Sequence, residues 1–343
     1  MKKASILIIY TGGTIGMRRN ENGTLVPFDF NTIEQEFPAV RNLNVDISVC
    51  KMEAIDSSNV TAARWSELAH IVADNYDAHD GFVVLHGTDT MSYTASALSF
   101  MLENLAKPVI FTGSQIPIGI LRTDGRENLI TAIEIAGSKT EDGAPLVPEV
   151  ALYFQNRLFR GNRTTKLSAE ALNAFASFNY APLADVGVNI QYNTSAIAPY
   201  APDFSDEFRI SENLSDDIVV VKLFPGIRPA TLRAMLLESG ARGVVLETYG
   251  AGNAPTSEWF VELVKEAIAR GVIVVNVSQC KDGAVQMHLY ETGLALQEAG
   301  VVSGHDMTIE AAVTKLMYVL GKNLPLSETV NLMRRPLRGE FTL

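Results

Sequence analysis

The apolar residues of this chain fall into short runs that alternate with amphipathic segments. Five of these runs lie in the first half of the chain, at Ser5–Tyr10, Ile47–Met52, Gly81–Leu85, Pro108–Thr112 and Val150–Gln155. Most are apolar at almost every position, as is typical of strands buried on both faces of a parallel sheet. The pattern therefore predicts a mainly parallel sheet whose two faces are covered by other elements.

Helical periodicity appears between these runs. Thr61 can cap a helix that begins directly after it. Trp65, Leu68 and Val72 then recur at a spacing of three or four residues and share one face. A second apolar stripe passes through residues 90–105. Strands and helices thus alternate along the chain, which predicts a doubly wound α/β fold.

The alternation is interrupted in the middle of the chain and then resumes. Residues 191–215 contain two prolines and a Ser/Asp/Glu-rich stretch without a period, which indicates a linker with an irregular arm. The predicted strands that follow are 218–224, 243–249 and 271–279, and the predicted helices are 231–238, 257–270 and 308–320. We therefore predict an N-terminal α/β domain at 1–190, a linker at 191–213 and a smaller α/β domain at 214–343.

Composition narrows the class of protein. Of 343 residues, 47% are hydrophobic and 20% are charged, which is ordinary for a globular protein and excludes wholesale disorder. The 39 acidic residues outnumber the 28 basic ones, and no basic stripe is present, so we expect no nucleic-acid partner. No apolar stretch approaches the roughly 20 residues of a membrane span. The short N-terminal apolar run leads into glycines without a cleavage site, so we expect a cytoplasmic protein without a membrane partner.

Two Gly-flanked threonines follow predicted strands, at the edge where doubly wound sheets bind ligands. Thr14 lies in the loop TGGTIG, and Thr88 lies in HGTDT. Taken singly, the first loop fits a tight turn, Asp89 fits a helix cap, and Lys166 fits a solvated basic turn. Together, Thr14, Thr88, Asp89 and Lys166 favour a site, because a hydroxyl becomes nucleophilic beside a base or a cation.

The sequence gives no sign of a cofactor. Five histidines are scattered without an H-E-x-x-H motif or a Cys/His cluster, so we expect no metal. TGGTIG lacks the G-x-G-x-x-G spacing of dinucleotide-binding loops, and no P-loop motif is present. We expect His86 to be a packed residue at a strand end rather than a catalytic base. The two cysteines are too few for a disulfide framework.

In these motifs the chain resembles the bacterial type I (cytosolic) L-asparaginases, over essentially its whole length. TGGTIG and HGTDTM are the most specific of the shared motifs. Both occur in this chain, in the same order as in the family, which leaves little room for coincidence. The other shared motifs are DSS at 56–58, TGSQIP at 112–117, GNRTTK at 161–166, YGAGNAP at 249–255 and LRGE at 337–340.

The resemblance implies a catalytic role for four side chains. Thr14 would attack the amide carbon of L-asparagine, forming an acyl-enzyme and releasing ammonia. Thr88, Lys166 and Asp89 would form a second group that activates the water for deacylation, and Asp89 and Thr88 would also contact the substrate. Backbone N–H groups near Thr14 and Thr88 would form the oxyanion hole. No metal or organic cofactor is implied.

The resemblance also implies residues that bind the substrate. Ser57 and the backbone near it would hold the α-carboxylate, with Asp56 in the same set. The main chain near Ser114 would contact the leaving amide. In the family, the second domain of a neighbouring subunit closes the site. That arrangement points to Asn253 here, and to a homodimer or a dimer of dimers.

Two positions depart from the family pattern. Many members carry a tyrosine in the loop after TGGTIG, where this chain has Thr24. Some bacterial members sense asparagine at a second site through an arginine that aligns with Glu247, and a glutamate cannot receive a carboxylate. Cys280, at the equivalent site, does not restore that function. We therefore expect no asparagine sensing through this position.

Three alternatives stay open at this point. The first is a broader glutaminase-asparaginase, because asparagine and glutamine differ by one methylene. The second is an amino-acid-binding homologue with weak turnover. The third is the amidotransferase subunit used in making glutaminyl-tRNA, which usually has an additional N-terminal domain and which the acidic charge of this chain does not favour.

Overall fold

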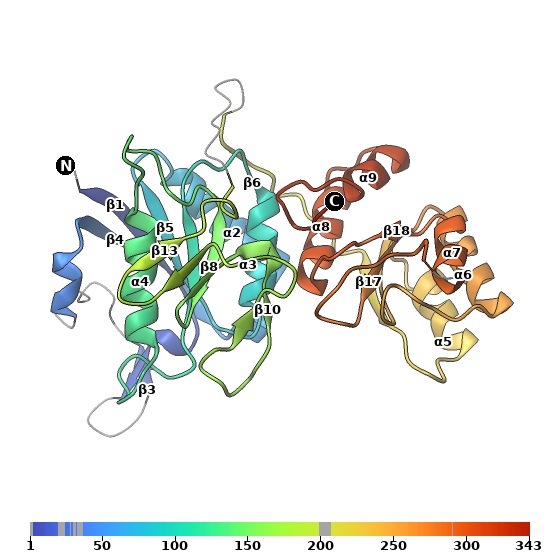
Figure 1. Cartoon of the computed structure of the whole chain (residues 1–343), viewed down its shortest axis with the longest axis horizontal. Coiled ribbons are helices and arrows are strands. Elements are labelled where there is room, and N and C mark those ends of the chain that lie inside the picture. Colours follow the sequence, from blue (N-terminus) through green and yellow to red (C-terminus); the bar gives the residue numbers. More distant parts are fainter. Residues whose placement is uncertain are drawn as a thin grey trace. The chain divides into compact units, whose positions relative to one another are not determined.

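The computed structural model describes residues 3–19, 25–27, 29, 32, 37–198, 207–289 and 291–343. The chain divides into two compact units, Met1–Ser211 and Glu212–Leu343. Each unit consists of a sheet with helices packed on it (Figure 1). The predicted fold class, a mainly parallel α/β domain followed by a smaller α/β domain, is confirmed.

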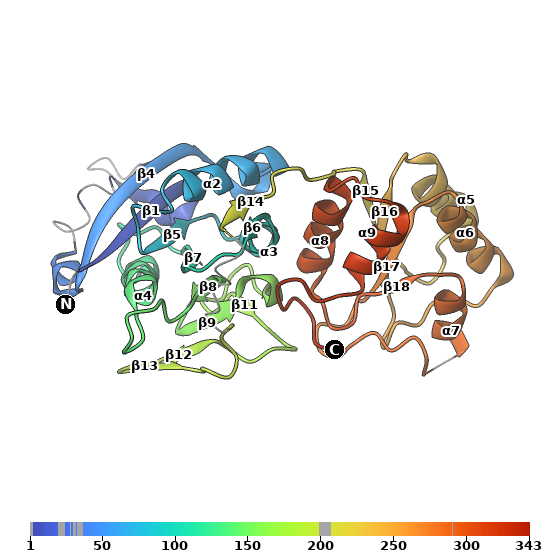
Figure 2. The same ribbon diagram turned by 90° about the horizontal axis from the view of Figure 1, so that it is seen from above.

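An eight-stranded sheet forms the centre of the first unit. Its strand order is β13-β12-β9-β8-β7-β5-β1-β4, and Figure 2 shows the strands in succession from β4 at the top to β13 at the bottom. The strands from β4 to β8 are parallel, and β9, β12 and β13 extend the sheet in antiparallel fashion. The strand bounds are β1 Ala4–Gly12, β4 Val45–Ile55, β5 Gly81–Leu85, β7 Val109–Thr112, β8 Val150–Phe154, β9 Arg157–Arg160, β12 Ala184–Val186 and β13 Ile190–Tyr192.

Helices cover both faces of this sheet, with α4 on one side and α2 and α3 on the other (Figure 2). The central strands β1, β5, β7 and β8 are buried on both sides, as their continuous apolar runs predict. Strand β4 lies at the edge of the sheet, and most of its residues are half-buried or exposed. Ile6 and Ile8 join the cluster that contains Leu129 of α4, whereas the alternate residues Leu7 and Ile9 are buried outside that cluster. The helix bounds are α2 Ala62–Asp74, α3 Met91–Met101 and α4 Gly125–Gly137.

Three central strands end at the same level, which places their loops side by side. Tyr10 of β1 is in register with Leu85 of β5, and Leu85 is in register with Thr112 of β7. The segments TGGTIG, HGTDT and GSQ therefore leave adjacent strands at one edge of the sheet. This edge is where ligands bind in open α/β sheets.

The segment predicted as an irregular linker contains ordered strands, so the prediction is wrong at these positions. Gln191 and Tyr192 belong to β13, which pairs with β12. Strand β14 (Arg209–Ile210) pairs with β6 (Leu102–Glu103). The helix predicted over 90–105 therefore ends at Met101, where β6 begins. Pairing with distant strands orders these residues, and a polar sequence without a period does not reveal such pairing. Residues 199–206 lie outside the described residues.

The second unit is built on a parallel sheet of four strands in the order β15-β16-β17-β18. Helix α8 covers one face, and α5 and α6 cover the other (Figure 2). Although α8 is buried along its length, no helix in the described part of the chain is long and apolar enough to cross a membrane. The bounds are β15 Ile218–Lys222, α5 Pro229–Arg233, a π-helical turn Ala234–Glu238, β16 Gly243–Thr248, α6 Glu258–Ala269, β17 Ile273–Ser278, α7 Glu291–Glu298, β18 Val302–Ser303, α8 Ile309–Gly321 and α9 Leu326–Met333.

Candidate active site

The loop after β1 lies against the loop after β5 through a contact between glycines. Gly12 and Gly13 have φ angles of +120° and +86°, a region that L side chains rarely adopt. A Cβ at Gly13 would lie 2.5 Å from the Cα of Gly87 in the HGTD loop. Thr14 follows at the start of a short 3-10 helix and is exposed. Glycine is therefore required for the two loops to lie this close, and Thr14 remains at the surface beside them.

Thr88, Asp89 and Lys166 form a hydrogen-bonded group. Lys166 Nζ donates to Thr88 Oγ1 at 2.8 Å and to Asp89 Oδ1 at 2.5 Å. Lys166 comes from a short strand, β10 (Thr165–Lys166), whereas the other two residues lie in the loop after β5. The lysine side chain is 17% exposed and the aspartate side chain 64%. The ammonium thus contacts the Thr88 hydroxyl, and the carboxylate stays open to a cationic group of a ligand.

Gln115 is a further member of this group, and we did not predict it from the sequence. Its Oε1 accepts a hydrogen bond from Thr88 Oγ1 at 3.2 Å, and its Nε2 donates to the carbonyl oxygen of Ala171, also at 3.2 Å. Gln115 follows Ser114 in the TGSQIP motif. The motif could have drawn attention to Gln115, but the direction of its side chain could not be read from the sequence.

The loop that carries Ser114 and Gln115 is fixed by the beginning of α4. Asp124 accepts hydrogen bonds from the backbone N–H groups of Gln115 and Ile116, both at 3.0 Å, through its two carboxylate oxygens. Asn128 Nδ2 donates to the carbonyl oxygen of residue 113 at 2.9 Å. Ser114 is buried, and its hydroxyl has no hydrogen-bond partner among the described residues. Such a hydroxyl is a candidate contact for a ligand.

Ser57 and Asp56 lie beside the HGTD loop and differ in exposure. Ser57 is buried, and its carbonyl oxygen accepts a hydrogen bond from Thr90 Oγ1 at 2.7 Å. A Cβ at Gly87 would lie 2.6 Å from Ser57 Oγ, so the serine also packs closely on this loop. Asp56 is exposed and accepts hydrogen bonds from the Oγ and N–H of Ser58, which lower the pKa of the Asp56 carboxyl.

His86 is a buried residue at the end of β5, as expected from the sequence. Trp65 Nε1 donates to Thr94 Oγ1, the Thr94 hydroxyl donates to His86 Nε2, and His86 Nδ1 donates to the carbonyl oxygen of Gly87 at 2.7 Å. Desolvation lowers the pKa of His86 to about 4, so the ring is neutral at physiological pH. Among the described residues, no group of three or more His, Cys, Asp or Glu side chains is placed to hold a metal ion.

Two predicted site positions are not part of this group. Asn253 belongs to the second unit, where its Oδ1 accepts a hydrogen bond from Thr292 Oγ1 at 2.7 Å and its backbone pairs with Tyr249. Thr24, which stands in the place of the family's tyrosine, lies outside the described residues. The first unit therefore brings together Thr88, Asp89 and Lys166, with Thr14, Ser57, Asp56 and Ser114 on the same and adjacent loops.

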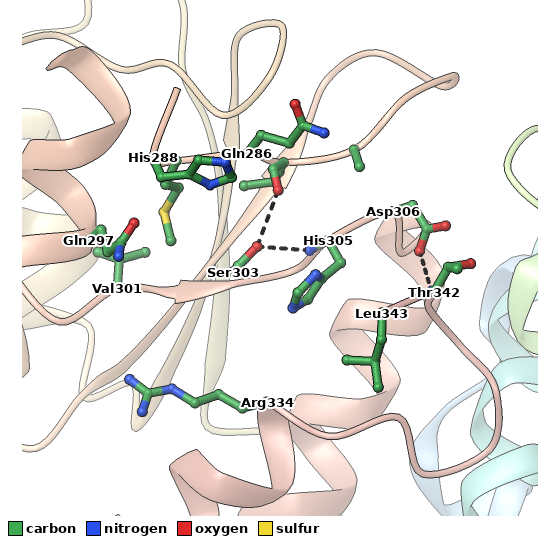
Figure 3. Close-up of a pocket in the computed structure, with 13 residues that line it drawn as sticks. Gln286, His288, Gln297, Val301, Ser303, His305, Asp306, Arg334, Thr342 and Leu343 are labelled. Atoms are coloured by element: carbon green, nitrogen blue, oxygen red, sulfur yellow. Dashed lines mark hydrogen bonds between the residues drawn. The ribbon is translucent and has the colours of Figure 1, made fainter. Parts of the chain in front are cut away.

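A pocket of about 840 Å³ lies in the second unit (Figure 3). His288, Ser303 and Arg334 are among its lining residues, and Asp306 at its edge accepts a hydrogen bond from the N–H of Thr342. None of the site residues predicted from the sequence lines this pocket. It is therefore a feature separate from the candidate active site.

Glu247 has a basic partner within its own unit. Lys222 of β15 is its register partner across the parallel sheet, and Lys222 Nζ lies 3.8 Å from Glu247 Oε1. The glutamate side chain is 13% exposed, so it is mostly enclosed. Its neighbours in sequence supply no cation, but the adjacent strand does.

The sequence matches the family described as "Asparaginase, N-terminal" over residues 5–198, and the "Glutaminase/Asparaginase C-terminal domain" over residues 217–333. The chain therefore belongs to the asparaginase family, and the resemblance found in the sequence motifs is confirmed.

Individual relatives match almost the entire chain. It is 44% identical to L-asparaginase 1 of Escherichia coli K12 over 350 residues, covering 100% of this chain and 99% of that protein. The crystal structure of L-asparaginase I from Vibrio cholerae matches with a TM-score of 0.89 and 42% identity, covering 99% of this chain and 100% of that one. The chain is also 41% identical to the 60 kDa lysophospholipase of Mus musculus, of which the match covers 62%.

Proposed function

We propose that this protein is an L-asparagine amidohydrolase, which converts L-asparagine to L-aspartate and ammonia. The observation that carries the proposal is the hydrogen-bonded group of Thr88, Asp89 and Lys166. Its first two members lie on the loop that is packed against the Thr14 loop. Two hydroxyls, one ammonium and one carboxylate suit amide hydrolysis through a covalent intermediate without a metal. The similarity to L-asparaginase 1 of Escherichia coli supports the same activity.

The proposed reaction has two halves. Thr14 Oγ attacks the side-chain amide carbon, the carbon–nitrogen bond breaks, and the leaving nitrogen takes up the hydroxyl proton and departs as ammonia. Water then attacks the resulting ester, which releases aspartate and returns a proton to Thr14. Thr88 and Lys166 assist this second half, and backbone N–H groups of the two glycine-containing loops stabilise the oxyanion, a contribution of about 3 kcal/mol in comparable sites.

The proposed recognition of the substrate uses groups around Thr88. The exposed Asp89 carboxylate receives the α-ammonium group, because it is the open end of the Lys166 pair. Ser57, with Asp56 beside it, takes the α-carboxylate through hydroxyl and backbone donors. The segment at Ser114, whose buried hydroxyl has no partner among the described residues, lies nearest the leaving amide.

We further propose a cytoplasmic protein that works as a homodimer or a dimer of dimers. Asn253 of a neighbouring subunit would close the site, as the resemblance to the type I asparaginases implies. The reaction needs no metal or organic cofactor, since the proposed steps use only hydroxyl, amine and carboxylate chemistry.

The test is steady-state kinetics on L-asparagine and L-glutamine with ammonia release as the measurement. We expect kcat/KM to favour asparagine, because the extra methylene of glutamine shifts its amide away from Thr14. One methylene is usually worth about 1–3 kcal/mol, or roughly 10- to 200-fold. Equal rates on both amides would instead identify a glutaminase-asparaginase. Aspartate or asparagine binding without ammonia release would identify an amino-acid-binding homologue.

A further inference from the structure

The hydrogen bonds around Thr88 determine where its hydroxyl proton points. A threonine hydroxyl offers one proton and two lone pairs, whereas an ammonium can only donate. Lys166 Nζ, at 2.8 Å, must therefore donate to Thr88 Oγ1 and occupy one lone pair. The Thr88 proton is then directed to Gln115 Oε1 at 3.2 Å. One lone pair of Thr88 is left for a ligand or a water molecule.

The orientation of the Gln115 amide follows from its second contact. A carbonyl oxygen can only accept, so the group of Gln115 that faces the Ala171 carbonyl at 3.2 Å must be the Nε2 donor. Oε1 then faces Thr88 as an acceptor. If the amide were flipped, two carbonyl oxygens would face each other and Thr88 would lose its acceptor. The Ala171 carbonyl therefore fixes the direction of the Thr88 proton through Gln115.

One hairpin supplies both contacts to this network. Strand β10, which ends at Lys166, pairs with β11 (Phe175–Ala176), and Ala171 lies in the loop between the two strands. Within that loop, Ser168 Oγ accepts hydrogen bonds from the N–H of Glu170 at 3.1 Å and of Ala171 at 2.9 Å. The turn that presents the Ala171 carbonyl is thus built on its own side-chain hydrogen bonds.

We infer that Gln115 is a positioning residue for catalysis: it holds the Thr88 hydroxyl proton away from the reacting atoms. The remaining lone pair of Thr88 can then accept a hydrogen bond from the water that attacks the acyl-enzyme. This inference deepens the proposed asparaginase activity and rests on it. Without Gln115, the Thr88 hydroxyl proton would be free to point at that water. The Thr88 O–H and the water O–H would then face each other as two donors, and the hydrogen bond from the water to Thr88 would be lost.

The first test is Gln115→Met, which keeps a side chain of similar length but removes both amide contacts. We expect kcat for asparagine to fall about tenfold or more, with KM and the Kd for aspartate within about threefold of wild type. The matched control is Gln279→Met in the second unit. Gln279 also donates its amide to backbone carbonyls, those of Leu223 and Glu247, but has no contact with Thr88. Its kcat is expected within about twofold of wild type.

The second test is the pH dependence of Gln115→Glu. A protonated carboxyl can donate to Ala171 and accept from Thr88, as the amide does, whereas an ionised carboxylate repels the Ala171 carbonyl. Charged groups on the elements around this position include Lys166, Asp89, Asp124 and Glu170, and all four are present in the wild type as well. The ratio of variant to wild-type kcat should therefore fall several-fold between about pH 5 and about pH 8.

Three outcomes would overturn the inference. One is an unchanged kcat in Gln115→Met, and another is a loss of aspartate binding in proportion to kcat, which would mark a purely structural residue. The third is a Gln115→Glu ratio that does not change with pH. Wild-type protein that releases no ammonia from asparagine would refute the proposed function itself, whereas active wild type with indifferent Gln115 variants would refute only the role of Gln115.

Discussion

Thr14 illustrates how a single residue can be assigned to chemistry rather than to folding. Its side chain is exposed at the start of a 3-10 helix, after two glycines with positive φ. The adjacent Ile15 is fully buried and belongs to the core of the first unit. Stability in this loop therefore comes from Ile15 and the glycines, so the Thr14 hydroxyl can be removed without loss of packing.

We accordingly predict that Thr14→Ala loses several orders of magnitude in kcat, because the proposed acyl-enzyme cannot form without the hydroxyl. The measurement is ammonia release from asparagine, together with a thermal unfolding curve that should match the wild type. Thr14→Ser, which restores a hydroxyl, is the control and should recover a measurable part of the activity. If Thr14→Ala kept more than about a tenth of wild-type activity, Thr88 would have to be considered as the nucleophile instead.

The sequence predicted the types of residue in the site better than their contacts. Thr88, Asp89 and Lys166 could be grouped because each follows a predicted strand end, and parallel strands end at one edge of a sheet. Gln115 follows β7 at the same edge, yet nothing in its spacing shows that its side chain turns toward Thr88. Nor does the sequence show which residues Asn253 contacts, because Asn253 belongs to the second unit and the Thr88 group to the first.

At the scale of elements, β5 and α3 are linked by a directed chain of hydrogen bonds. Trp65 of α2 donates to Thr94 of α3, Thr94 donates to His86 at the end of β5, and His86 donates to Gly87 of the HGTD loop. Each member has its donor and acceptor matched only while the imidazole is neutral. Burial therefore holds the pKa of His86 near 4, against 6.5 in the unfolded chain.

The difference between the folded and unfolded pKa values of His86 predicts that the free energy of unfolding falls in acid. Because the folded-state pKa is depressed, the stabilisation is complete above about pH 6.5 and is lost as the pH falls toward 4. For this one group the loss by pH 4 is about 3 kcal/mol in the free energy of unfolding. Urea unfolding can be followed by the fluorescence of Trp65 in a Trp259→Phe background, since the chain has two tryptophans. His86→Gln should reduce the pH dependence by about that amount; an equally steep dependence in this variant would contradict the prediction.

The elements were predictable where burial leaves a pattern in the sequence. Strand β5 has the predicted bounds, because each of its five residues is buried and apolar. The antiparallel strands β9, β12 and β13 were missed, since strands of three or four residues contain few apolar positions and take their order from pairing partners. Helix α4 was also missed, although Leu129, Ala132 and Ile133 have helical spacing, because its polar first turn concealed its start.

At the scale of the whole molecule, the two units carry different parts of the proposed function. The first unit holds Thr14 and the Thr88 group, and the second holds Asn253 and Glu247. The resemblance implies that some bacterial members sense a second asparagine through an arginine at the position of Glu247. Here Glu247 is mostly enclosed, and its basic partner is Lys222 on the neighbouring strand, at 3.8 Å.

We predict that velocity rises hyperbolically with asparagine concentration. A carboxylate brought beside Glu247 would be repelled, and Lys222 could serve it only by giving up its existing partner. Without a separate asparagine site at this position, the coupling free energy that such a site would contribute is absent, and so is the cooperativity that it would produce. The measurement is initial velocity over a wide range of asparagine concentrations, with a Hill coefficient of about 1 expected. Glu247→Gln, which removes the repulsion but adds no cation, is the control and should also give a hyperbola. Sigmoidal kinetics in the wild type, or an asparagine bound beside Glu247 in a soaked crystal, would show that Lys222 or another group supplies the missing cation.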